Sequence, residues 1–235
     1  MYECNRKMIL PAGEIHMWQV ELDQPATHGV PPACSLSRTE REIAQRFFFE
    51  HDRRRFIVRR RTLRSILGRY LQVAPEQLSF RKNPGGKPQL AGSDIHFNVS
   101  HSAGLAVYVF GRCCQLGVDI EYLRPMPDAS QIAAAFFSPS ERTFLEALPV
   151  TDQQKAFFYF WTRKEAFVKA IGKGLSYPLD RFDVSPRPGK PGALVRTPDH
   201  TGWFITALAP ASGWVGALVT NKEGLRLVPR RWIPE

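Results

Sequence analysis

Residues 116–121 read Leu-Gly-Val-Asp-Ile-Glu, in which apolar residues alternate with Gly117, Asp119 and Glu121. Successive side chains of a β-strand point to opposite faces of its sheet, so one face of this strand is apolar and the other carries both carboxylates. The Cα atoms of Asp119 and Glu121 then lie about 6.5 Å apart, close enough for both side chains to reach one cation. Taken alone, the pattern is more typical of an acidic strand face that is exposed to solvent.

Two further β-type runs lie upstream, at 95–99 and 105–110, with the turn-rich residues 102–104 between them. Together with 116–121 they predict an antiparallel meander of three strands. Two more strands are predicted downstream, at 203–208 and 214–220.

Helices are predicted on both sides of the meander. Ser37 and Glu40 form a capping-box signature that opens a helix of about ten residues, and a second helix follows it. After the meander, residues 138–141 (Ser-Pro-Ser-Glu) open a third helix, and a longer helix covers 152–171. Helices followed by strands thus occur twice, which predicts an α+β fold of two similar halves that meet near residue 123.

The formal net charge of the 235-residue chain is +10, and much of the excess falls between Arg38 and Arg69. That stretch holds eleven arginines and four acidic residues. A basic patch attracts polyanions, which include nucleic acid, a phosphate-rich small molecule and an acidic protein. Composition alone does not choose among these partners.

Apolar runs in this sequence stay well short of the roughly 18 residues that a membrane-spanning helix needs, and the N-terminus lacks the layout of a signal peptide. We therefore expect a soluble, cytoplasmic protein. The four cysteines, at positions 4, 34, 113 and 114, show neither a C-x-x-C pair nor the spacing of metal ligands. Free thiols are expected at all four positions.

The predicted helix 152–171 has one broad apolar face. Lys164 falls near the centre of that face, where a charge is unusual for a purely structural helix, although its long stem could reach the edge of the core. Glu165 and Lys169 lie on the flank, one turn apart, and by themselves would be read as a routine salt bridge on a solvated face. The position of Lys164 favours a functional site on this helix.

His101 lies between Ser100 and Ser102, where a predicted strand gives way to a turn. Hydroxyl groups, an imidazole and a backbone turn together form a candidate phosphate cradle, although a lone histidine is more often structural. Residues 85–88 (Gly-Gly-Lys-Pro) match neither a Walker loop nor a dinucleotide fingerprint. The sequence therefore argues against a nucleoside triphosphatase.

Five ordered blocks carry a family resemblance. They are 85–88 (GGKP), 97–102 (FNVSHS), 117–121 (GVDIE), 136–141 (FFSPSE), and 161–166 (WTRKEA) followed by Lys169, Gly172, Gly174 and Leu175. In order and spacing they resemble the surfactin-synthetase-activating, or Sfp-type, 4′-phosphopantetheinyl transferases of the W/KEA kind. The resemblance covers about residues 46 to 185.

The resemblance implies two similar α+β subdomains related by pseudo-twofold symmetry, each an antiparallel sheet packed with helices, with coenzyme A bound in the cleft between them. We expect these subdomains at residues 1–122 and 123–235. Carried over by position, Asp119, Glu121 and Glu165 would hold Mg²⁺, with Mn²⁺ as an alternative ion. Contacts with coenzyme A are expected from Arg55, Lys87, Ser100, His101 (to the 3′-phosphate), Lys164 and Lys169 (to the diphosphate). Arg46 and Arg53 compete with Arg55 for its place.

The resemblance further implies a holo-[acyl-carrier-protein] synthase type of enzyme. It would move the 4′-phosphopantetheine group from coenzyme A to a serine of an apo acyl or peptidyl carrier protein and release 3′,5′-ADP. Glu165, Lys169 and Asp119 are the expected catalytic residues, with Glu165 as the candidate general base. We expect an acidic carrier and a monomeric enzyme, and we expect neither nucleic acid nor membrane as a partner.

Two other functions stay open from the sequence. A nucleic-acid-binding protein that uses the patch from Arg38 to Arg69 would explain the pI of about 9.8, but zinc-finger spacing, RNP-type strands and basic-zipper patterns are missing from the sequence. A catalytically silent relative would only bind carrier proteins. The enzymatic interpretation requires Glu165 to lie close to Asp119 and Glu121.

Overall fold

A computed structural model describes residues 7–23, 35–174, 177–184, 193–194 and 202–232. Its two main sheets have four strands each. The first has the order β10 (Arg226–Arg231), β1 (Glu14–Glu21), β5 (Leu105–Arg112), β4 (Ile95–Ser102), and the second has the order β6 (Leu116–Tyr122), β9 (Trp214–Thr220), β8 (Phe204–Leu208), β7 (Ala193–Leu194). A small antiparallel hairpin joins β2 (Phe80–Lys82) to β3 (Pro88–Leu90). All pairings are antiparallel except that of β10 with β1.

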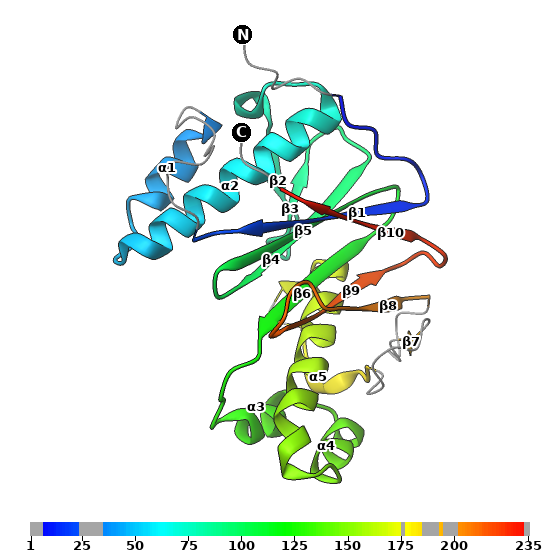
Figure 1. Ribbon diagram of the computed structural model, residues 1–235. Coiled ribbons are helices and arrows are strands. Elements are labelled where there is room, and N and C mark those ends of the chain that lie inside the picture. The colour runs from blue at the N-terminus through cyan, green and yellow to red at the C-terminus, as the bar shows by residue number, and fades with distance from the viewer. Residues whose placement is uncertain (1–6, 24–34, 175–176, 185–192, 195–201, 233–235) are drawn as a thin grey trace.

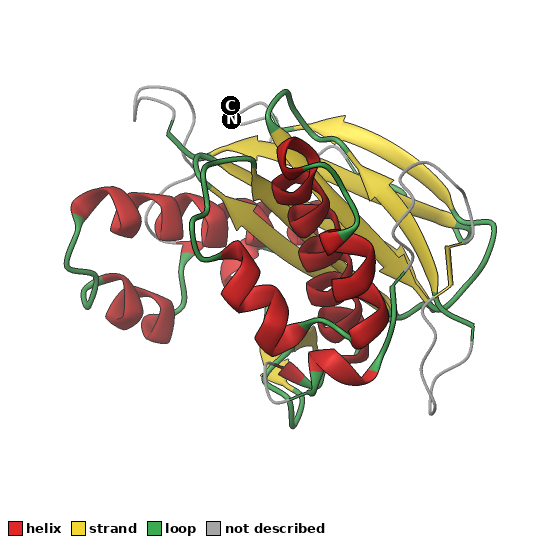
Figure 2. Cartoon of the chain, turned by 90° about the horizontal axis from the view of Figure 1, so that it is seen from below, coloured by secondary structure: helices red, strands yellow, loops and turns green. Residues whose placement is uncertain are grey.

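The two main sheets are covered by different helices. They are α1 (Arg38–Ala44), α2 (Glu50–Leu71), α3 (Ala129–Phe136), α4 (Pro139–Glu146) and α5 (Val150–Ile171), with short 3₁₀ turns at Pro75–Gln77 and Leu179–Arg181. Leu63, Ile66 and Leu67 of α2 pack on the first sheet, and Phe167 and Val168 of α5 pack on the second (Figure 1, Figure 2). Each long helix therefore covers one sheet.

The order of elements in the first half recurs in the second. A strand, a short helix with a capping box, a helix of 22 residues and two strands occur as β1, α1, α2, β4, β5 and again as β6, α4, α5, β8, β9. Both sheets place the first of these strands next to the last, as β1-β5-β4 and as β6-β9-β8. The predicted α+β fold with two similar subdomains is confirmed.

The predicted three-stranded meander is wrong in one strand. β4 and β5 pair, but β6 pairs with β9 and lies beside β4 without backbone pairing. Gly117 explains part of this choice, because a Cβ there would collide with Ala166 and Ala170 of α5, so β6 fits closely under that helix.

Side chains of β4 connect the two sheets along β6. Asn98 Oδ1 accepts a hydrogen bond from the backbone N–H of Val118 at 2.9 Å. Ser100 Oγ and Ser102 Oγ accept from the next alternate N–H groups of β6, at 3.3 and 3.0 Å. The edge of β6 that pairs with no strand is thereby satisfied by polar side chains, and β4 and β6 form the seam between the halves (Figure 1).

The two sheets are not formed from two consecutive parts of the chain. Residues 116–122 belong to the second sheet, and β10, from the end of the chain, belongs to the first. A division between residues 122 and 123 stays a prediction, because strand pairing does not give the limits of folding units. An apolar layer fills the space between the two sheets, formed by Ile15, Met17, Leu105, Val107, Val109, Cys114, Leu116, Val118, Ile120, Leu208 and Leu218.

The cysteines and the helices bear on two further predictions from the sequence. Cys113 and Cys114 are free thiols, as expected, whereas Cys4, Cys34 and the motif residue Leu175 lie outside the described residues. Within the described part of the chain, every helix is too short or too polar to cross a lipid bilayer.

Candidate functional site at the seam between the halves

A cavity of about 740 Å³ opens over the seam and takes side chains from both halves. Its lining consists of Glu40, Ile43, Phe56, Arg59, Arg60, Leu63, Phe80, Lys82, Pro88, Val99, Ser100, His101, Asp119, Glu121, Trp161, Glu165 and Lys169. Six of the nine predicted site residues lie in this one cavity: Ser100, His101, Asp119, Glu121, Glu165 and Lys169. One end is acidic, and the other combines apolar side chains with arginines of α2.

Asp119 and Glu165 form the acidic end. Asp119 is 5% exposed, and its Oδ1 accepts hydrogen bonds from Ser100 Oγ at 2.8 Å and from Lys169 Nζ at 2.5 Å. Its Oδ2, like Oε1 of Glu165, is buried and has no hydrogen-bond partner among the described residues. Burial raises the pKa of both carboxyl groups above their usual values, and the neighbouring carboxylates add to this effect, while Lys169 opposes it.

Glu121, the third predicted metal ligand, lies at the rim of the cavity. Its Oε2 accepts from Ser102 Oγ at 2.7 Å and pairs with Arg124 at 3.3 Å. Within the described residues, no three Asp, Glu, His or Cys side chains already stand close enough together to hold a metal ion. Lys169 occupies one carboxylate oxygen of Asp119, and Arg124 pairs with one carboxylate oxygen of Glu121.

His101 stands in a strongly positive environment. The pKa of its imidazole lies below the usual value because of the atoms packed around the ring and the charges of Arg59, Lys169 and Arg55. His101 is itself exposed, so solvent weakens this shift. A neutral imidazole among three cations is suited to bind an anion, to which its ring N–H would donate a hydrogen bond.

The other three predicted residues do not line the cavity. Arg55 lies next to it and makes a bidentate pair with Asp23, at 2.7 and 2.6 Å. Lys87 is half-buried and donates to Leu116 O at 2.7 Å and to Ala170 O at 3.1 Å, and burial lowers its pKa to about 8. Lys87 therefore connects β6 to α5, a structural contact that the sequence did not indicate.

Lys164 is fully enclosed in the second half. Its ammonium pairs with Glu141 Oε2 at 2.7 Å and donates to the carbonyl oxygens of Leu179 and Phe182, both at 2.7 Å. Lys164 does not line the cavity, and all of these partners lie inside one half, so this geometry gives no support to its expected contact with coenzyme A, which stays a prediction. The charge at the centre of the apolar face is explained by a buried ion pair instead.

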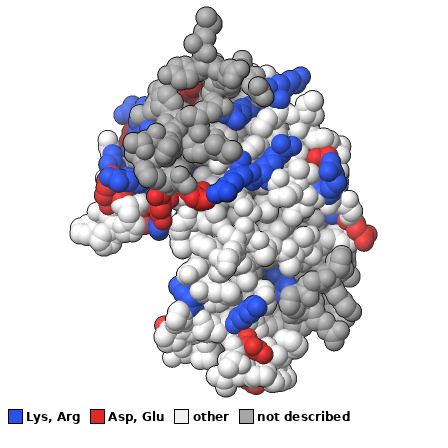
Figure 3. All heavy atoms as spheres, in the orientation of Figure 1, with Lys and Arg blue, Asp and Glu red and all other residues white. Residues whose placement is uncertain are grey.

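Sequence reasoning missed Glu40, Arg59, Arg60 and Lys82 as cavity residues. Arg59 and Arg60 follow Phe56 by about one helical turn, so the helical period could have indicated that all three lie on the same side of α2. Figure 3 shows basic and acidic side chains interspersed over the upper part of the molecule, which contains α1 and α2. Arg38, Arg53 and Arg54 pair with Glu42 or Glu50, so the basic patch is partly neutralised.

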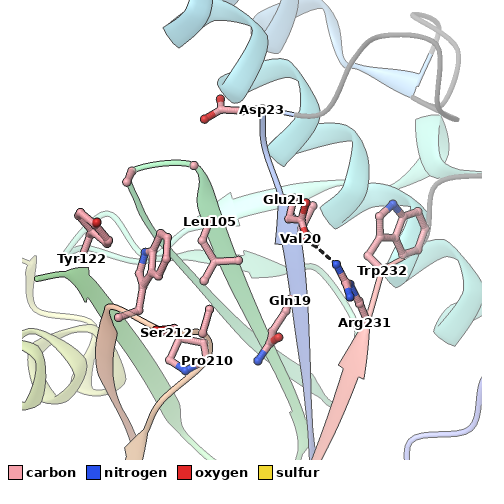
Figure 4. A pocket seen from close by; sticks show the side chains of 14 residues that line it. Gln19, Val20, Glu21, Asp23, Leu105, Tyr122, Pro210, Ser212, Arg231 and Trp232 are labelled. Atoms are coloured by element: carbon pink, nitrogen blue, oxygen red, sulfur yellow. Dashed lines mark hydrogen bonds and ion pairs between the residues drawn. The ribbon is translucent and has the colours of Figure 1, made fainter.

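A second, larger hollow of about 1010 Å³ lies at the far ends of β1 and β6 and contains none of the predicted site residues. Its lining includes Gln19, Leu105, Tyr122 and the ion pair of Glu21 with Arg231, at 2.5 Å (Figure 4). Of these two hollows, only the smaller contains buried carboxylate oxygens that have no partner among the described residues, and cations lie beside them, so the smaller hollow is the candidate site.

Two sequence families match consecutive parts of the chain. Residues 24–111 match the family described as "4'-phosphopantetheinyl transferase, N-terminal", and residues 115–219 match the "4'-phosphopantetheinyl transferase superfamily". The 4'-phosphopantetheinyl transferase HetI of Nostoc sp. is 39% identical over 229 residues, which cover 96% of this chain and 94% of HetI. This chain belongs to the 4′-phosphopantetheinyl transferase superfamily.

Other 4′-phosphopantetheinyl transferases are similar over shorter stretches. Sfp of Bacillus subtilis is 35% identical over 150 residues, covering 63% of this chain and 66% of Sfp. The psf-1 transferase of Bacillus pumilus is 36% identical over 167 residues, covering 70% of each chain. The predicted resemblance to the Sfp-type 4′-phosphopantetheinyl transferases is confirmed.

Proposed function

We propose that this protein transfers the 4′-phosphopantetheine group from coenzyme A to a serine of an apo acyl or peptidyl carrier protein and releases 3′,5′-ADP. The observation that carries the proposal is the cavity at the seam, where Asp119 of β6 and Glu165 of α5 lie with Lys169 and with His101 from the first half. Membership of the transferase superfamily supports the same reaction.

Mg²⁺, with Mn²⁺ as an alternative, fits the acidic end of the cavity. Asp119 Oδ2 and Glu165 Oε1 are buried carboxylate oxygens without a partner among the described residues, and a hard divalent cation prefers such ligands. We assign Asp119, Glu121 and Glu165 as the residues that would hold the ion. When bound, it would offset negative charge on the diphosphate oxygens of coenzyme A.

The cations of the cavity would position coenzyme A. Lys169 reaches the centre of the site from α5 and is free to stabilise the leaving phosphate of 3′,5′-ADP once it exchanges Asp119 for the diphosphate. His101 and Arg59 lie on the first half and would receive the 3′-phosphate. Positioning and charge stabilisation supply most of the rate in phosphoryl transfer, so these side chains need no covalent role.

Glu165 is our candidate for the general base that takes the proton of the carrier serine. Its carboxylate is buried near Asp119, and burial together with that neighbour raises its pKa, which strengthens it as a base. The serine oxygen then attacks the β-phosphorus, the bond from this phosphorus to the bridging oxygen breaks, and 3′,5′-ADP leaves.

The carrier protein is proposed to be acidic around its serine, because Arg59 and Arg60 of α2 line the cavity. A monomer suffices for the reaction, since one chain provides both walls of the site. Nucleic-acid binding is not supported, because several arginines of the patch are paired with Glu42, Glu50 or Asp23.

The proposal is tested by incubating the protein with coenzyme A, Mg²⁺ and a panel of apo carrier proteins, followed by intact mass measurement. We expect one carrier at least to gain the mass of the phosphopantetheine arm. A carrier with its serine changed to alanine and an assay with EDTA serve as controls. Coenzyme A binding without any carrier modification would instead favour a silent, carrier-binding relative.

A further inference from the structure

The two halves share a buried ion pair at equivalent places. In the second half, Glu141 of the α4 capping box pairs with Lys164, the fifteenth residue of α5, at 2.7 Å. In the first half, Glu40 of the α1 capping box pairs with Arg64, the fifteenth residue of α2, at 2.7 Å. In both halves this pair fastens the short helix to the long one, so it is a structural element of the repeated fold.

The first half adds a second cation to this pair. Arg60 contacts Glu40 Oε1 through Nε at 2.7 Å and through Nη2 at 2.5 Å, while Arg64 keeps Oε2. The residue of α5 equivalent to Arg60 is Phe160, which is 1% exposed. Arg60 is therefore not required by the repeated ion pair, and it differs from Arg64 in lining the cavity.

Glu40 and Phe80 hold the Arg60 guanidinium from two sides. The guanidinium carbon lies 5.2 Å from the centre of the Phe80 ring, and that of Arg64 lies 5.0 Å from it. Burial opposes ionisation of Glu40, but Arg60 and the backbone N–H of Ser37 lower its pKa below the usual value. By contrast, burial raises the pKa of Glu141, which has a single lysine. Glu40 is thus a charged anchor with one arginine on each oxygen.

The remaining donors of Arg60 face no partner within the part of the chain that the structure describes. Its Nη1 has no hydrogen bond or ion pair among the described residues, and its side chain is 21% exposed in a cavity that also contains Arg59 and Lys82. A guanidinium fixed along one edge presents its other N–H groups in a rigid plane, which matches two oxygens of a phosphate.

We propose that Arg60 binds a phosphate of coenzyme A and that Glu40 is a positioning residue which fixes the guanidinium for this contact. The proposal deepens the proposed function and rests on it. A carboxylate in an anion-binding cavity would ordinarily weaken binding by charge repulsion. Here both of its oxygens are taken by arginines, so its effect is to orient Arg60 rather than to repel the ligand.

Calorimetric titration of the apo protein with 3′,5′-ADP and with coenzyme A tests the proposal. Glu40→Gln keeps the capping box, in which glutamine serves as well, but removes the charge that holds Arg60. We expect affinity for both ligands to fall about tenfold in Glu40→Gln and also in Arg60→Gln. The double variant should lose little more than either single one, because the two residues act as a unit.

Glu141→Gln is the matched control, since it removes the equivalent structural charge away from the cavity. It should lower the melting temperature while leaving ligand affinity within twofold of the wild type. If Glu40→Gln also left affinity within twofold, Glu40 would be structural only and the proposal would be overturned. Should Glu40→Gln fail to fold, unchanged affinity in Arg60→Gln would overturn it equally.

The outcome is separable from a failure of the proposed function. Wild-type protein that neither binds coenzyme A nor modifies a carrier would overturn both proposals. If the wild type binds coenzyme A and modifies a carrier, and the Arg60 and Glu40 variants keep its affinity, the proposed function stands. Only the roles proposed for Arg60 and Glu40 are then overturned.

Discussion

Lys169 Nζ lies 2.5 Å from Asp119 Oδ1, so a lysine of α5 holds one oxygen of the carboxylate that is proposed to bind metal. The lysine and a divalent cation compete for the same negative charge. Asp119 is 5% exposed and would be costly to leave ionised and unpaired, which explains its ion pair with Lys169.

Replacing Lys169 with methionine should strengthen metal binding in the absence of coenzyme A. Without the competing ammonium we expect Mn²⁺ to bind about tenfold more tightly, as measured by electron paramagnetic resonance of free Mn²⁺. Turnover should nevertheless fall, because the leaving group loses its cation. Lys155→Met, on the exposed side of the same helix, is the control and should change neither quantity. Equal or weaker Mn²⁺ binding in Lys169→Met would contradict the competition.

Replacing Glu165 with glutamine should stabilise the protein and inactivate it. Because the folded-state pKa of Glu165 is raised, its ionised form costs folding free energy at any pH above that pKa. Calorimetry at pH 8 should show a melting temperature higher by about 2–4 °C for each kcal/mol gained. The difference should shrink as the pH falls through the raised pKa, since the wild-type carboxyl is then neutral. Turnover should drop by about a hundredfold or more.

Two results would contradict this assignment of Glu165. Near-normal turnover of Glu165→Gln at saturating Mg²⁺ would exclude it as the base and as an essential ligand. If coenzyme A and Mg²⁺ raise the melting temperature of the variant as much as that of the wild type, Glu165 is excluded as a metal ligand but not as the base.

His101 should take up a proton when a phosphate binds. Its pKa is held below the usual value in the free protein, and a nearby phosphate dianion would raise it. Titration of the protein with 3′,5′-ADP at pH 6 in buffers of different ionisation enthalpy should show more proton uptake for the wild type than for His101→Asn. The affinity of the wild type should therefore gain more from acidification between pH 7 and 6. Identical uptake in the two proteins would place the phosphate away from His101.

Asn98→Ala should weaken the seam between the halves. It leaves the buried N–H of Val118 without its acceptor, which costs about 1–3 kcal/mol of unfolding free energy. Asn221→Ala removes the same kind of bond, to the N–H of Gln115, at an exposed place and should cost much less. Urea denaturation of both variants measures the difference. Equal losses would mean that the seam adds nothing beyond an ordinary surface bond.

Encounter with the carrier protein should depend on salt. If an acidic carrier approaches the arginines of α1 and α2, raising the ionic strength from low to physiological should lower kcat/KM for the carrier while kcat changes little. The affinity for coenzyme A is measured at the same salt concentrations, so that any weakening of coenzyme A binding by salt can be separated from the effect on the carrier. A kcat/KM that does not respond to salt would argue against electrostatic steering.

Local sequence patterns predicted much of the fold. The capping boxes at Ser37 and Ser138 marked the starts of α1 and α4, and the strand 214–220 has the predicted limits. The pattern at 116–121 placed Asp119 and Glu121 on one strand correctly. These successes share a cause, because caps and alternation depend only on neighbours in the chain.

Long-range partners could not be predicted in the same way. The period of β6 showed which face carries the apolar side chains but not that β9 would be its neighbour. Lys164 pairs with Glu141, more than twenty residues away, and its place in the apolar face did not indicate this buried partner. The equivalent spacing from Glu40 to Arg64 was available in the sequence, but the two stretches share too few identical residues to look like a repeat. The roles of the cavity residues stay predictions.

The last strand, β10, completes the first sheet. Its residues 226–231 run along β1 near the start of the chain, so Glu14 faces Arg226 across the whole length of the sequence. A nascent chain could not complete its first sheet until almost everything else had been synthesised, and β1 would meanwhile offer an open edge to other strands. Despite their similar architecture, the two halves are thus interlocked by the last strand, and separately expressed fragments would each lack part of their own sheet.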